Sequence, residues 1–419
     1  MTPVDGPLFD CSVEAAQARL LAIGQRLEIE ELATEDAFGR HLAAELNARV
    51  NLPGADVSIM DGYAIRAQDV DTSKPRTEFR IVGESAAGHP HLGSIDRGQA
   101  CRISTGAVLP AGATAVVAQE DTTRTGELLT LDHARCGPVE PGKFIRKTGS
   151  DLTCGQPMLA AHTQLGPGEL ALVSAGGYLK LPVFARPRVA LLSSGDELVP
   201  PGQTPKPGQL VSTNATMLGH QARQAGGIAI DFGIASDRPE DLLGRLREAC
   251  SCCDLVVTSG GISVGDHDHV LGCLGELGFA LHVRKLRLRP GRPTTFGQVG
   301  DTPVIALPGN PASTYVAFEL FARPLIMHMQ GSQNPYHAPI RVELATPLRA
   351  AGNRAHYIRA RVDRGRATPL STQVSGALRS LAGHNALLIQ RPQTPAMPAG
   401  AMVDALLLPP PVPPTVEWS

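Results

Sequence analysis

Residues 188–329 carry the pattern that constrains the fold most, because apolar runs alternate there with segments of helical periodicity. Val189-Ala190-Leu191-Leu192 is a continuous apolar run, as expected of a strand that is buried on both faces. Strands that alternate with helices predict a doubly wound parallel sheet covered by helices. The predicted strands are 189–192, 228–232, 255–257, 280–288 and 304–307, and the predicted helices are 214–224, 239–249, 268–277 and 311–329.

The segments before and after this α/β region have a different character. Residues 49–149 contain short β-type runs between glycines and prolines, which predict a small inserted β domain. Helical spacing of apolar residues predicts helices over 12–23 and 37–46, which belong to a mixed N-terminal domain. We therefore expect a multidomain protein of α/β and β type. The predicted domains are 1–48 with 150–182 (mixed N-terminal domain), 49–149 (inserted β domain), 183–330 (central α/β domain) and 331–419 (C-terminal β domain with a proline-rich tail).

The charge of the chain is nearly balanced, with 38 Lys and Arg residues against 40 Asp and Glu residues. A protein that binds nucleic acid through its bulk charge would be strongly basic, so we expect no nucleic-acid partner. No stretch approaches the ~20 apolar residues of a membrane helix, and the N-terminus lacks the features of a secretory signal. Eight cysteines are too few for a disulfide scaffold. We expect a reduced, cytoplasmic protein that does not contact a membrane.

Three glycine-rich loops follow predicted strands of the α/β region. They are Ser193–Glu197, Thr258–Asp268 and Pro308–Ser313, and the last one opens a helix. Ligands of open α/β sheets bind beyond the carboxyl ends of the strands, where glycine lets the backbone approach a phosphate closely. One such loop is common turn chemistry, but three at one sheet edge predict a phosphate or nucleotide site. Their spacing matches neither the P-loop nor the dinucleotide-binding fingerprint.

Five cations fall within nine residues of the strand that leads to this edge. Leu286 and Leu288 alternate with Lys285, Arg287 and Arg289, so the three cations share one face. A solvated strand face is the plain interpretation of such a run. Mutual repulsion among so many cations favours an anionic ligand instead, and we predict an oxyanion pocket. The five cations are Arg284, Lys285, Arg287, Arg289 and Arg292.

Carboxylates also follow the predicted strands. Beside a phosphate site, such groups supply the oxygen ligands that Mg²⁺ prefers. Asp237 precedes Arg238-Pro239 and could alternatively be an ordinary helix N-cap. The residues that we expect to hold the metal are Glu197, Asp237 and Asp268.

Six motifs occur together in one order along the chain. They are Met60-Asp61-Gly62-Tyr63-Ala64, Ser104-Thr105-Gly106-Ala107, Ser194-Gly195-Asp196-Glu197-Leu198, Thr258-Ser259-Gly260-Gly261 through Asp268, Arg289-Pro290-Gly291-Arg292-Pro293 and Leu307-Pro308-Gly309-Asn310-Pro311. In this combination the chain resembles the molybdopterin molybdenumtransferase family over essentially its whole length. The resemblance implies four domains and a homodimer. It also implies a reaction in which adenylylated molybdopterin and molybdate give the molybdenum cofactor and AMP, with Mg²⁺. A molybdopterin adenylyltransferase would act upstream.

The resemblance also assigns roles to residues of this chain. In the family the inserted β domain of one subunit faces the sheet edge of the other, so the site would form across the dimer. The residues implied in catalysis are Asp61, Thr105, Asp151, Glu197, Asp237 and Asp268. Those expected to bind the pterin nucleotide are Ser194, Gly195, Thr258, Ser259, Gly260, Gly261, Ser263, Gly265, Pro308, Gly309 and Asn310. Those expected to bind molybdate are Lys285, Arg289, Arg292, Ser313, Arg359, Ser375 and Ser380.

The basic turn departs from the family, which usually has lysine where this chain has Arg289 and Arg292. Planar guanidinium forks thus replace point charges while the positive charge is kept. Two other functions stay open. A molybdopterin-binding or scaffold protein of this fold would lack turnover and would not need the site carboxylates, yet the five carboxylates implied in catalysis are all present. A separate molybdopterin adenylyltransferase is a single α/β domain and has no place for residues 1–182 or 331–419.

Overall fold

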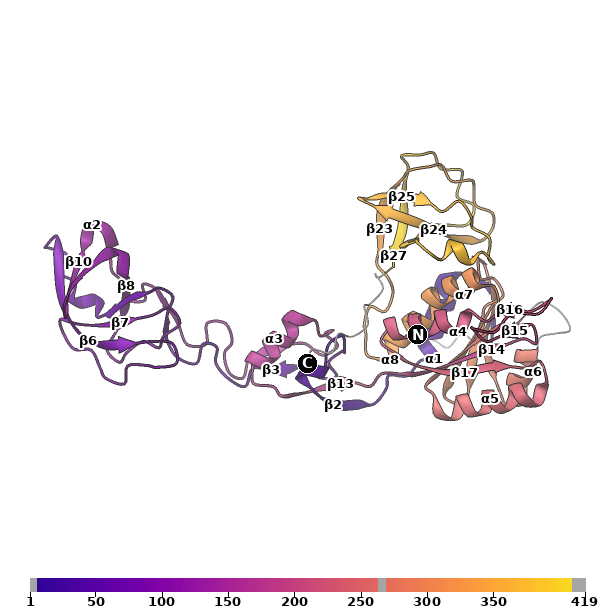
Figure 1. Ribbon diagram of the computed structural model, residues 1–419, viewed down its shortest axis with the longest axis horizontal. Helices are drawn as coiled ribbons and strands as arrows, with labels where there is room; N and C mark the ends of the chain where they lie inside the picture. The colour runs from indigo at the N-terminus through magenta and orange to yellow at the C-terminus, as the bar shows by residue number, and fades with distance from the viewer. Residues whose placement is uncertain (1–5, 263–268, 409–419) are drawn as a thin grey trace. The chain divides into compact units, whose positions relative to one another are not determined.

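The computed structural model describes residues 6–262 and 269–408 of the 419-residue chain. It divides into two compact units (Figure 1). The larger unit comprises Met1–Glu30, Gly39–Ala43 and Pro182–Ser419, and the smaller unit comprises Glu31–Phe38 and Ala44–Leu181. The chain passes between them along β2 (Ile29–Ala33) and β13 (Lys180–Phe184), which pair with each other. The predicted proline-rich tail and the sites Ser263, Gly265 and Asp268 lie outside the described residues.

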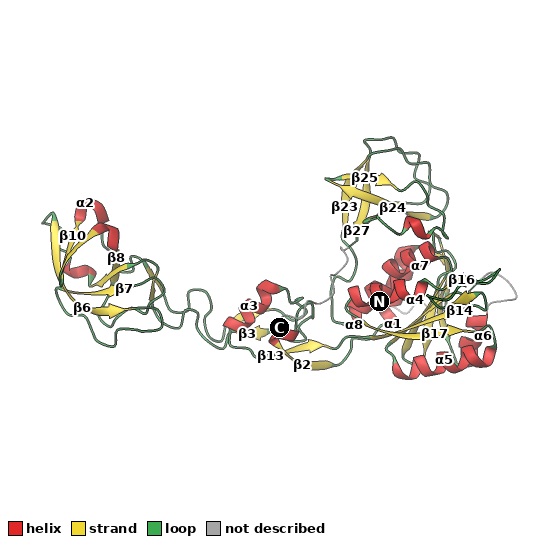
Figure 2. Ribbon diagram, in the orientation of Figure 1, coloured by secondary structure: helices red, strands yellow, loops and turns green. Residues whose placement is uncertain are grey.

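A seven-stranded sheet forms the centre of the larger unit. Helices cover both of its faces, as Figure 2 shows. Successive side chains of one central strand alternate between the two cores, so that strand is buried on both faces as predicted. In spatial order the strands are β1 (Leu8–Cys11), β19 (Ala280–Leu286), β21 (Thr295–Val299), β22 (Thr302–Leu307), β18 (Leu255–Ser259), β14 (Arg188–Ser194) and β17 (Ile228–Ala235).

Two groups of helices bury the two faces of this sheet. One face packs against α1 (Val13–Ile23), α4 (Asn214–Gln224), α7 (Pro311–Ala317), the π-helical turn η4 (Phe318–Ala322) and α8 (Arg323–Met329). The other face packs against α5 (Pro239–Cys252) and α6 (His269–Glu276). No helix within the described residues is long and apolar enough to cross a membrane.

The predicted fold class is confirmed, but part of the sheet is antiparallel. Strands β17, β14, β18 and β22 run parallel, whereas β21 pairs antiparallel with both β19 and β22. Only residues 287–294 link β19 to β21, and 300–301 link β21 to β22. A parallel crossover needs about a dozen residues or more, so connections this short force antiparallel pairing.

Two predicted elements are wrong in detail. The expected single strand over 280–288 divides, because β19 ends at Leu286 and the next residues enter another sheet as β20 (Leu288–Arg289). The helix expected over 37–46 does not form. Gly39 has a φ of 75°, which is outside the helical region, and Leu42 forms an antiparallel bridge with Val183. The apolar residues of this segment are therefore buried by an extended chain.

The C-terminal sheet packs on the α/β layer within the larger unit. Strand β24 pairs with both β25 and β26, so five strands close into a small barrel, and β20 extends it. Side chains of β24, β26 and β27 join the same core as α7 and α8. The strands in order are β20, β24 (Ala355–Asp363), β25 (Arg366–Pro369), β23 (Pro339–Leu344), β27 (Met402–Leu407) and β26 (Ala386–Gln390).

The smaller unit contains the β sheet that the inserted segment predicts. Two further strand pairs and α3 (Pro167–Ala175) complete it. The six-stranded sheet has the order β8 (Ala115–Ala118), β5 (Gly62–Ile65), β7 (Gln99–Ile103), β6 (Arg76–Ser85), β10 (Leu128–Asp132) and β9 (Thr122–Thr125). The pairs are β4 (Val57–Ser58) with β11 (Ile145–Arg146), and β3 (Leu46–Asn47) with β12 (Pro157–Leu159); α2 covers His133–Cys136. The boundaries of the four predicted domains stay predictions.

Leu288 tests the packing of the C-terminal barrel on the α/β layer. Its side chain is fully buried in the core that the two share. Leu288→Ala should lower the free energy of unfolding of the larger unit by about 2–5 kcal/mol, because truncation leaves a cavity. Val374→Ala is the control, since Val374 lies in the same unit and is 67% exposed, and it should change that free energy by less than ~0.5 kcal/mol. Equal effects of the two substitutions in urea denaturation would contradict the described packing.

Candidate nucleotide and oxyanion site

A cavity of about 540 Å³ lies at the carboxyl ends of β14, β18 and β22. All three predicted glycine-rich loops contribute to its wall. The predicted residues that line it are Ser194, Glu197, Ser259, Gly260, Gly309 and Asn310. Leu198 and Pro311, which belong to the motifs, also line it. The structure adds residues that the sequence analysis missed, namely Leu210, Val211, Ser212, Thr213, Asn214, Gly376 and Leu378.

Glycine is required where two of these loops meet. Gly260 has a φ of 91°, and a Cβ there would lie 2.5 Å from the carbonyl oxygen of Ser194. At Gly261 a Cβ would lie 2.7 Å from Ser194 Oγ. Both contacts are closer than a real side chain tolerates, so the loops can approach each other only without a Cβ. The sequence thereby brings two loops together at one rim of the cavity.

Several buried polar atoms around this cavity have no protein partner among the described residues. Ser194 Oγ, Ser212 Oγ and Asn214 Oδ1 are such atoms on the wall, and Thr258 Oγ1 is another at the end of β18. The other side of the Asn214 amide is used, since Nδ2 donates to Gly309 O at 2.9 Å. Buried polar groups are normally hydrogen-bonded. Their clustering indicates that a polar ligand completes this site.

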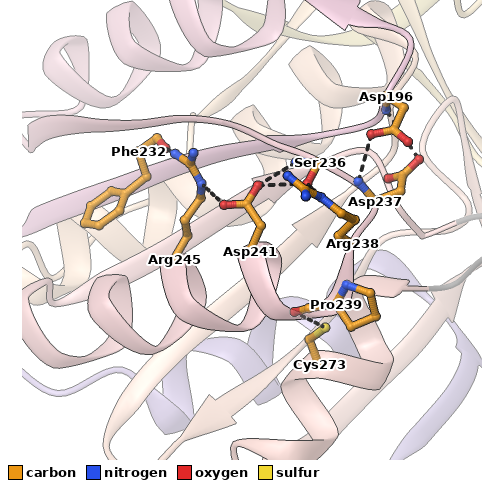
Figure 3. Close-up of polar contacts among 9 residues, drawn as sticks. All are labelled: Asp196, Phe232, Ser236, Asp237, Arg238, Pro239, Asp241, Arg245 and Cys273. Carbon is orange, nitrogen blue, oxygen red and sulfur yellow. Dashed lines mark hydrogen bonds and ion pairs between the residues drawn. The ribbon is translucent and has the colours of Figure 1, made fainter.

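The predicted metal ligands are not gathered into one cluster. The Glu197 carboxylate curls back over Gly195, where a Cβ would meet its Oε2 at 2.4 Å, and it faces the cavity. Asp237 is instead tied to Asp196: each carboxylate accepts the other's backbone N–H, at 3.0 and 3.3 Å (Figure 3). Within residues 6–262 and 269–408, no three His, Cys, Asp or Glu side chains are placed to hold a metal.

Asp241 positions the turn that carries Asp237. It accepts hydrogen bonds from Ser236 N and Oγ at 2.9 and 3.0 Å, and from Arg245 Nε at 2.9 Å (Figure 3). The Ser236 amide and the Arg245 guanidinium lower the pKa of Asp241 to about 2. Asp237 does not cap α5, whose N-cap is Arg238, so the N-cap alternative is not observed.

The cations of the predicted basic face differ in their exposure and in their partners. Leu286 and Leu288 are fully buried while Arg287 and Arg289 are exposed, which confirms their alternation. Lys285 has a φ of 63°, so the strand is irregular there and its side chain is half-buried. Arg292 lies 3.5 Å from the carboxylate of Asp10, and both side chains are about half exposed. A carboxylate that the sequence analysis did not consider thus shares the basic turn.

Arg359 is completely buried on β24. Its Nη2 donates to the carbonyl oxygens of Val374 and Thr372 at 3.3 and 3.5 Å, while Nε and Nη1 find no partner among the described residues. Ser375 O, next in the chain, accepts from Ala312 N at 2.9 Å. The 372–375 segment therefore connects the Arg359 guanidinium to the first turn of α7.

The three serines predicted with Arg359 differ in their surroundings. Ser313 is buried on α7, and its backbone N–H donates to Asn310 O at 3.0 Å. Ser380 is buried in η5 (Leu378–Ser380), and its hydroxyl donates to Ala377 O at 2.5 Å. Ser375 is half-buried. Burial of Arg359 lowers the pKa of its guanidinium, yet it remains a cation whose unpaired donors favour an anion.

Asp61 and Thr105, predicted to act together, are hydrogen-bonded in the smaller unit. Asp61 Oδ1 accepts from Thr105 N at 2.7 Å and from Thr105 Oγ1 at 3.1 Å. The Thr105 backbone amide, followed by its hydroxyl, lowers the pKa of Asp61. Asp151, also predicted, forms an exposed ion pair with Arg146. The carboxylates of Asp61 and Asp151 thus both lie at the surface of the smaller unit.

Family models match three successive segments of the chain. They are described as the MoeA N-terminal region (domain I and II), over residues 11–177, a probable molybdopterin binding domain, over 190–328, and the MoeA C-terminal region (domain IV), over 341–408. A molybdopterin molybdenumtransferase of Bacillus subtilis is 32% identical over 94% of each chain. The chain belongs to the molybdopterin molybdenumtransferase family.

Other relatives agree with this family. A molybdopterin molybdenumtransferase of a Nostoc species is 37% identical over 77% of this chain and 74% of its own length. A crystal structure of a molybdopterin biosynthesis MoeA protein from Pyrococcus horikoshii superimposes with a TM-score of 0.83 at 28% identity, and covers 95% of this chain and 99% of that one. The resemblance predicted from the six motifs is confirmed.

A sequence signal could have found some, but not all, of the missed residues of this molybdenumtransferase-family site. Ser212, Thr213 and Asn214 directly precede or open a predicted helix, so their place at a strand-to-helix edge was available from the sequence. Asp10 and Gly376 lie far along the chain from the loops they approach, and no local pattern marks them.

Asp241 gives a pH-dependent test of the turn beside Asp237. Because its pKa is lowered in the folded protein, its contribution to stability is present above its ordinary value of 3.8 and is lost as the pH falls towards about 2. Asp241→Asn should therefore be less stable than the natural protein at pH 7, and the difference should shrink below pH ~4. Urea denaturation between pH 7 and 3 measures it. Asp363→Asn on β24 is an exposed control; a deficit of Asp241→Asn that is independent of pH would contradict the ion pair.

Proposed function

We propose that this chain inserts molybdenum into molybdopterin, taking adenylylated molybdopterin and molybdate and releasing the molybdenum cofactor and AMP. The observation that carries this proposal is the cavity at the sheet edge, with its buried polar atoms lacking protein partners. Membership of the molybdenumtransferase family supports a transferase. We also propose that the reaction takes place in the cytoplasm and that a molybdopterin adenylyltransferase supplies the substrate.

The residues divide into two groups by the chemistry they offer. The backbone of the loops at Ser194, Gly260 and Gly309 offers close approach to the phosphates and pterin. The Arg359 guanidinium offers unpaired donors for the tetrahedral oxyanion. Ser313 lies on α7, the helix that the 372–375 segment beside Arg359 contacts. A nucleotide and an oxyanion would thus be held by different parts of the larger unit.

Glu197 fits a role in holding Mg²⁺. Its exposed carboxylate faces the cavity, and carboxylate oxygens are the ligands that Mg²⁺ prefers. Asp237 is hydrogen-bonded to Asp196, the residue before Glu197. Asp268 is the third predicted ligand and lies outside the described residues. A bound Mg²⁺ would supply charge neutralisation to the phosphates. The chain's own part is to orient these carboxylates, as Asp241 does for the turn of Asp237.

A non-catalytic binding or scaffold protein of the same fold is the alternative. Such a protein needs the cavity and not the carboxylates. The described acidic residues Asp61, Asp151, Glu197 and Asp237 are all present, and the curated relatives are transferases. These observations favour the enzyme.

Glu197→Gln tests the reaction. We expect the natural protein, incubated with adenylylated molybdopterin, molybdate and Mg²⁺, to release AMP and form active cofactor. Glu197→Gln should fold normally and reduce AMP release by at least ~100-fold, since a neutral amide is a poor Mg²⁺ ligand. Glu343→Gln is the control, because Glu343 forms an exposed ion pair with Arg366 in the C-terminal sheet. Absence of AMP release by the natural protein would contradict the proposed function, and full activity of Glu197→Gln would remove Glu197 from it.

We further infer a homodimer in which the Asp61–Thr105 pair of one subunit completes the site of the other. The pair is exposed, so its hydrogen bonds are not needed for the core of the smaller unit. Asp61→Asn and Glu197→Gln proteins should each be inactive alone, and mixing them should restore about a quarter of the natural protein's activity, because random exchange makes about half of the dimers heterodimers. This outcome follows because one site of a heterodimer then carries neither substitution. No recovery after verified subunit exchange would place the site within one chain.

A further inference from the structure

His384 is a half-buried polar residue, close enough to Arg359 to be affected by its charge, that neither the sequence motifs nor the proposed function uses. It lies just before β26, and its ring stands edge-on to Tyr315 of α7, with ring centroids 4.9 Å apart. Its Nδ1 lies 2.9 Å from Leu381 O. A carbonyl oxygen only accepts, so Nδ1 carries the proton, and in the neutral ring Nε2 is an acceptor. The orientation and the tautomer of His384 are thus fixed by the fold.

Nε2 of His384 has no hydrogen-bond partner in the part of the chain that the structure describes, although it is buried. The same holds for Nε and Nη1 of Arg359. Strand pairing places Arg359 opposite Leu387, three residues beyond His384. Buried polar atoms without partners are costly. Here they include two donors of a cation and one acceptor of a neutral ring, which points to a ligand that satisfies both.

The groups around His384 set its charge. Burial lowers the pKa of His384, and Arg359 on β24 lowers it further, while the hydrogen bond to Leu381 and the charge of Glu319 oppose this shift. The carboxylate of Glu319 already has other partners: Gln221 Nε2 donates to its Oε1 at 2.7 Å, and His337 Nε2 lies 3.1 Å from its Oε2. Tyr315 is neutral, because burial raises the pKa of its hydroxyl. His384 is therefore neutral near pH 7 while no anion is bound.

An oxyanion bound to the Arg359 guanidinium would change the protonation equilibrium of His384. A negative charge beside an imidazole favours its protonated form. The proton would have to sit on Nε2, since Nδ1 already carries one. We propose that His384 takes up one proton from solvent at Nε2 when an oxyanion binds to Arg359, and donates it to that oxyanion as a charge-assisted hydrogen bond. This inference rests on the proposed oxyanion pocket and adds a binding residue to it.

The proposal predicts how molybdate affinity depends on pH. Below the pKa of the empty site His384 is already protonated, so the affinity is constant there. Above that pKa each bound oxyanion brings one proton, and the affinity falls as the pH rises, by up to ~10-fold per pH unit. The fall ends above the higher pKa of the occupied site, where binding no longer takes up a proton.

His356 is the other histidine that this prediction must be separated from. It lies on β24 opposite Arg289 in the pairing with β20. Burial, Arg289, Arg359 and Arg354 together lower its pKa to about 4. With three cations around it, His356 should stay neutral across the physiological range. His356→Gln is thus a matched control for His384→Gln, because each replaces a half-buried histidine that is affected by the charge of Arg359 with a side chain that does not titrate.

Titration calorimetry of the full chain with molybdate between pH 5.5 and 8.5 tests the inference. Measurement in two buffers of different ionisation enthalpy counts the protons taken up. We expect approximately one proton per molybdate on the falling limb for the natural protein and for His356→Gln, and no uptake and a flat affinity for His384→Gln. Should His384→Gln fail to fold, the proton count of the natural protein still decides whether binding is proton-linked, and His356→Gln decides whether His356 is responsible.

The outcomes separate this inference from the proposed function. Binding that is independent of pH in the natural protein, or proton uptake that His384→Gln retains or His356→Gln abolishes, would overturn the role of His384 and leave the pocket in place. No molybdate binding at any pH, or binding that Arg359→Gln leaves unchanged, would overturn the oxyanion pocket itself, and the inference with it.

Discussion

The larger unit depends on the burial of one face of the C-terminal sheet against the α/β layer. Leu286 and Leu288, on the short segment that leaves the central sheet, share a core with Tyr357 and Leu387 of the barrel. Val316 of α7 joins the same core. Burial of apolar area is the dominant favourable term in such packing and is not directional. The orientation of the barrel on the α/β layer is instead set by the chain connection, because β20 enters the barrel directly after β19.

This packing determines which polar groups lose contact with water. Tyr357 and Arg359 are two residues apart on β24, so they share a face of the strand. Since Tyr357 belongs to the core shared with α7, Arg359 lies on the same side of the strand and is completely buried. A buried guanidinium with free donors is expensive unless an anion pairs with it. The proposed oxyanion pocket would thus be a consequence of how the barrel is attached.

Local patterns in the sequence were sufficient for most of the fold and for part of the site. The strand–helix alternation predicted the doubly wound region, and the glycine-rich loops predicted the cavity wall at Ser194, Gly260 and Gly309. Strand β21 was not among the predicted strands, and its antiparallel direction depends on the length of the loops around it, which a local pattern does not encode. The helix over 37–46 was wrong because the same apolar residues are buried by an extended segment. The pairing of Arg292 with Asp10 and the burial of Arg359 depend on tertiary contacts that no local pattern encodes.

The location of the oxyanion is the central claim, and diffraction measures it most directly. Crystals soaked in molybdate can be examined at the molybdenum absorption edge, where anomalous scattering identifies the metal itself. We expect molybdenum beside the Arg359 guanidinium, with its oxygens at hydrogen-bonding distance from Nε and Nη1. Molybdenum bound only at the exposed Arg287 and Arg292, with Arg359 still without an anion, would contradict a pocket built by the attachment of the barrel to α7.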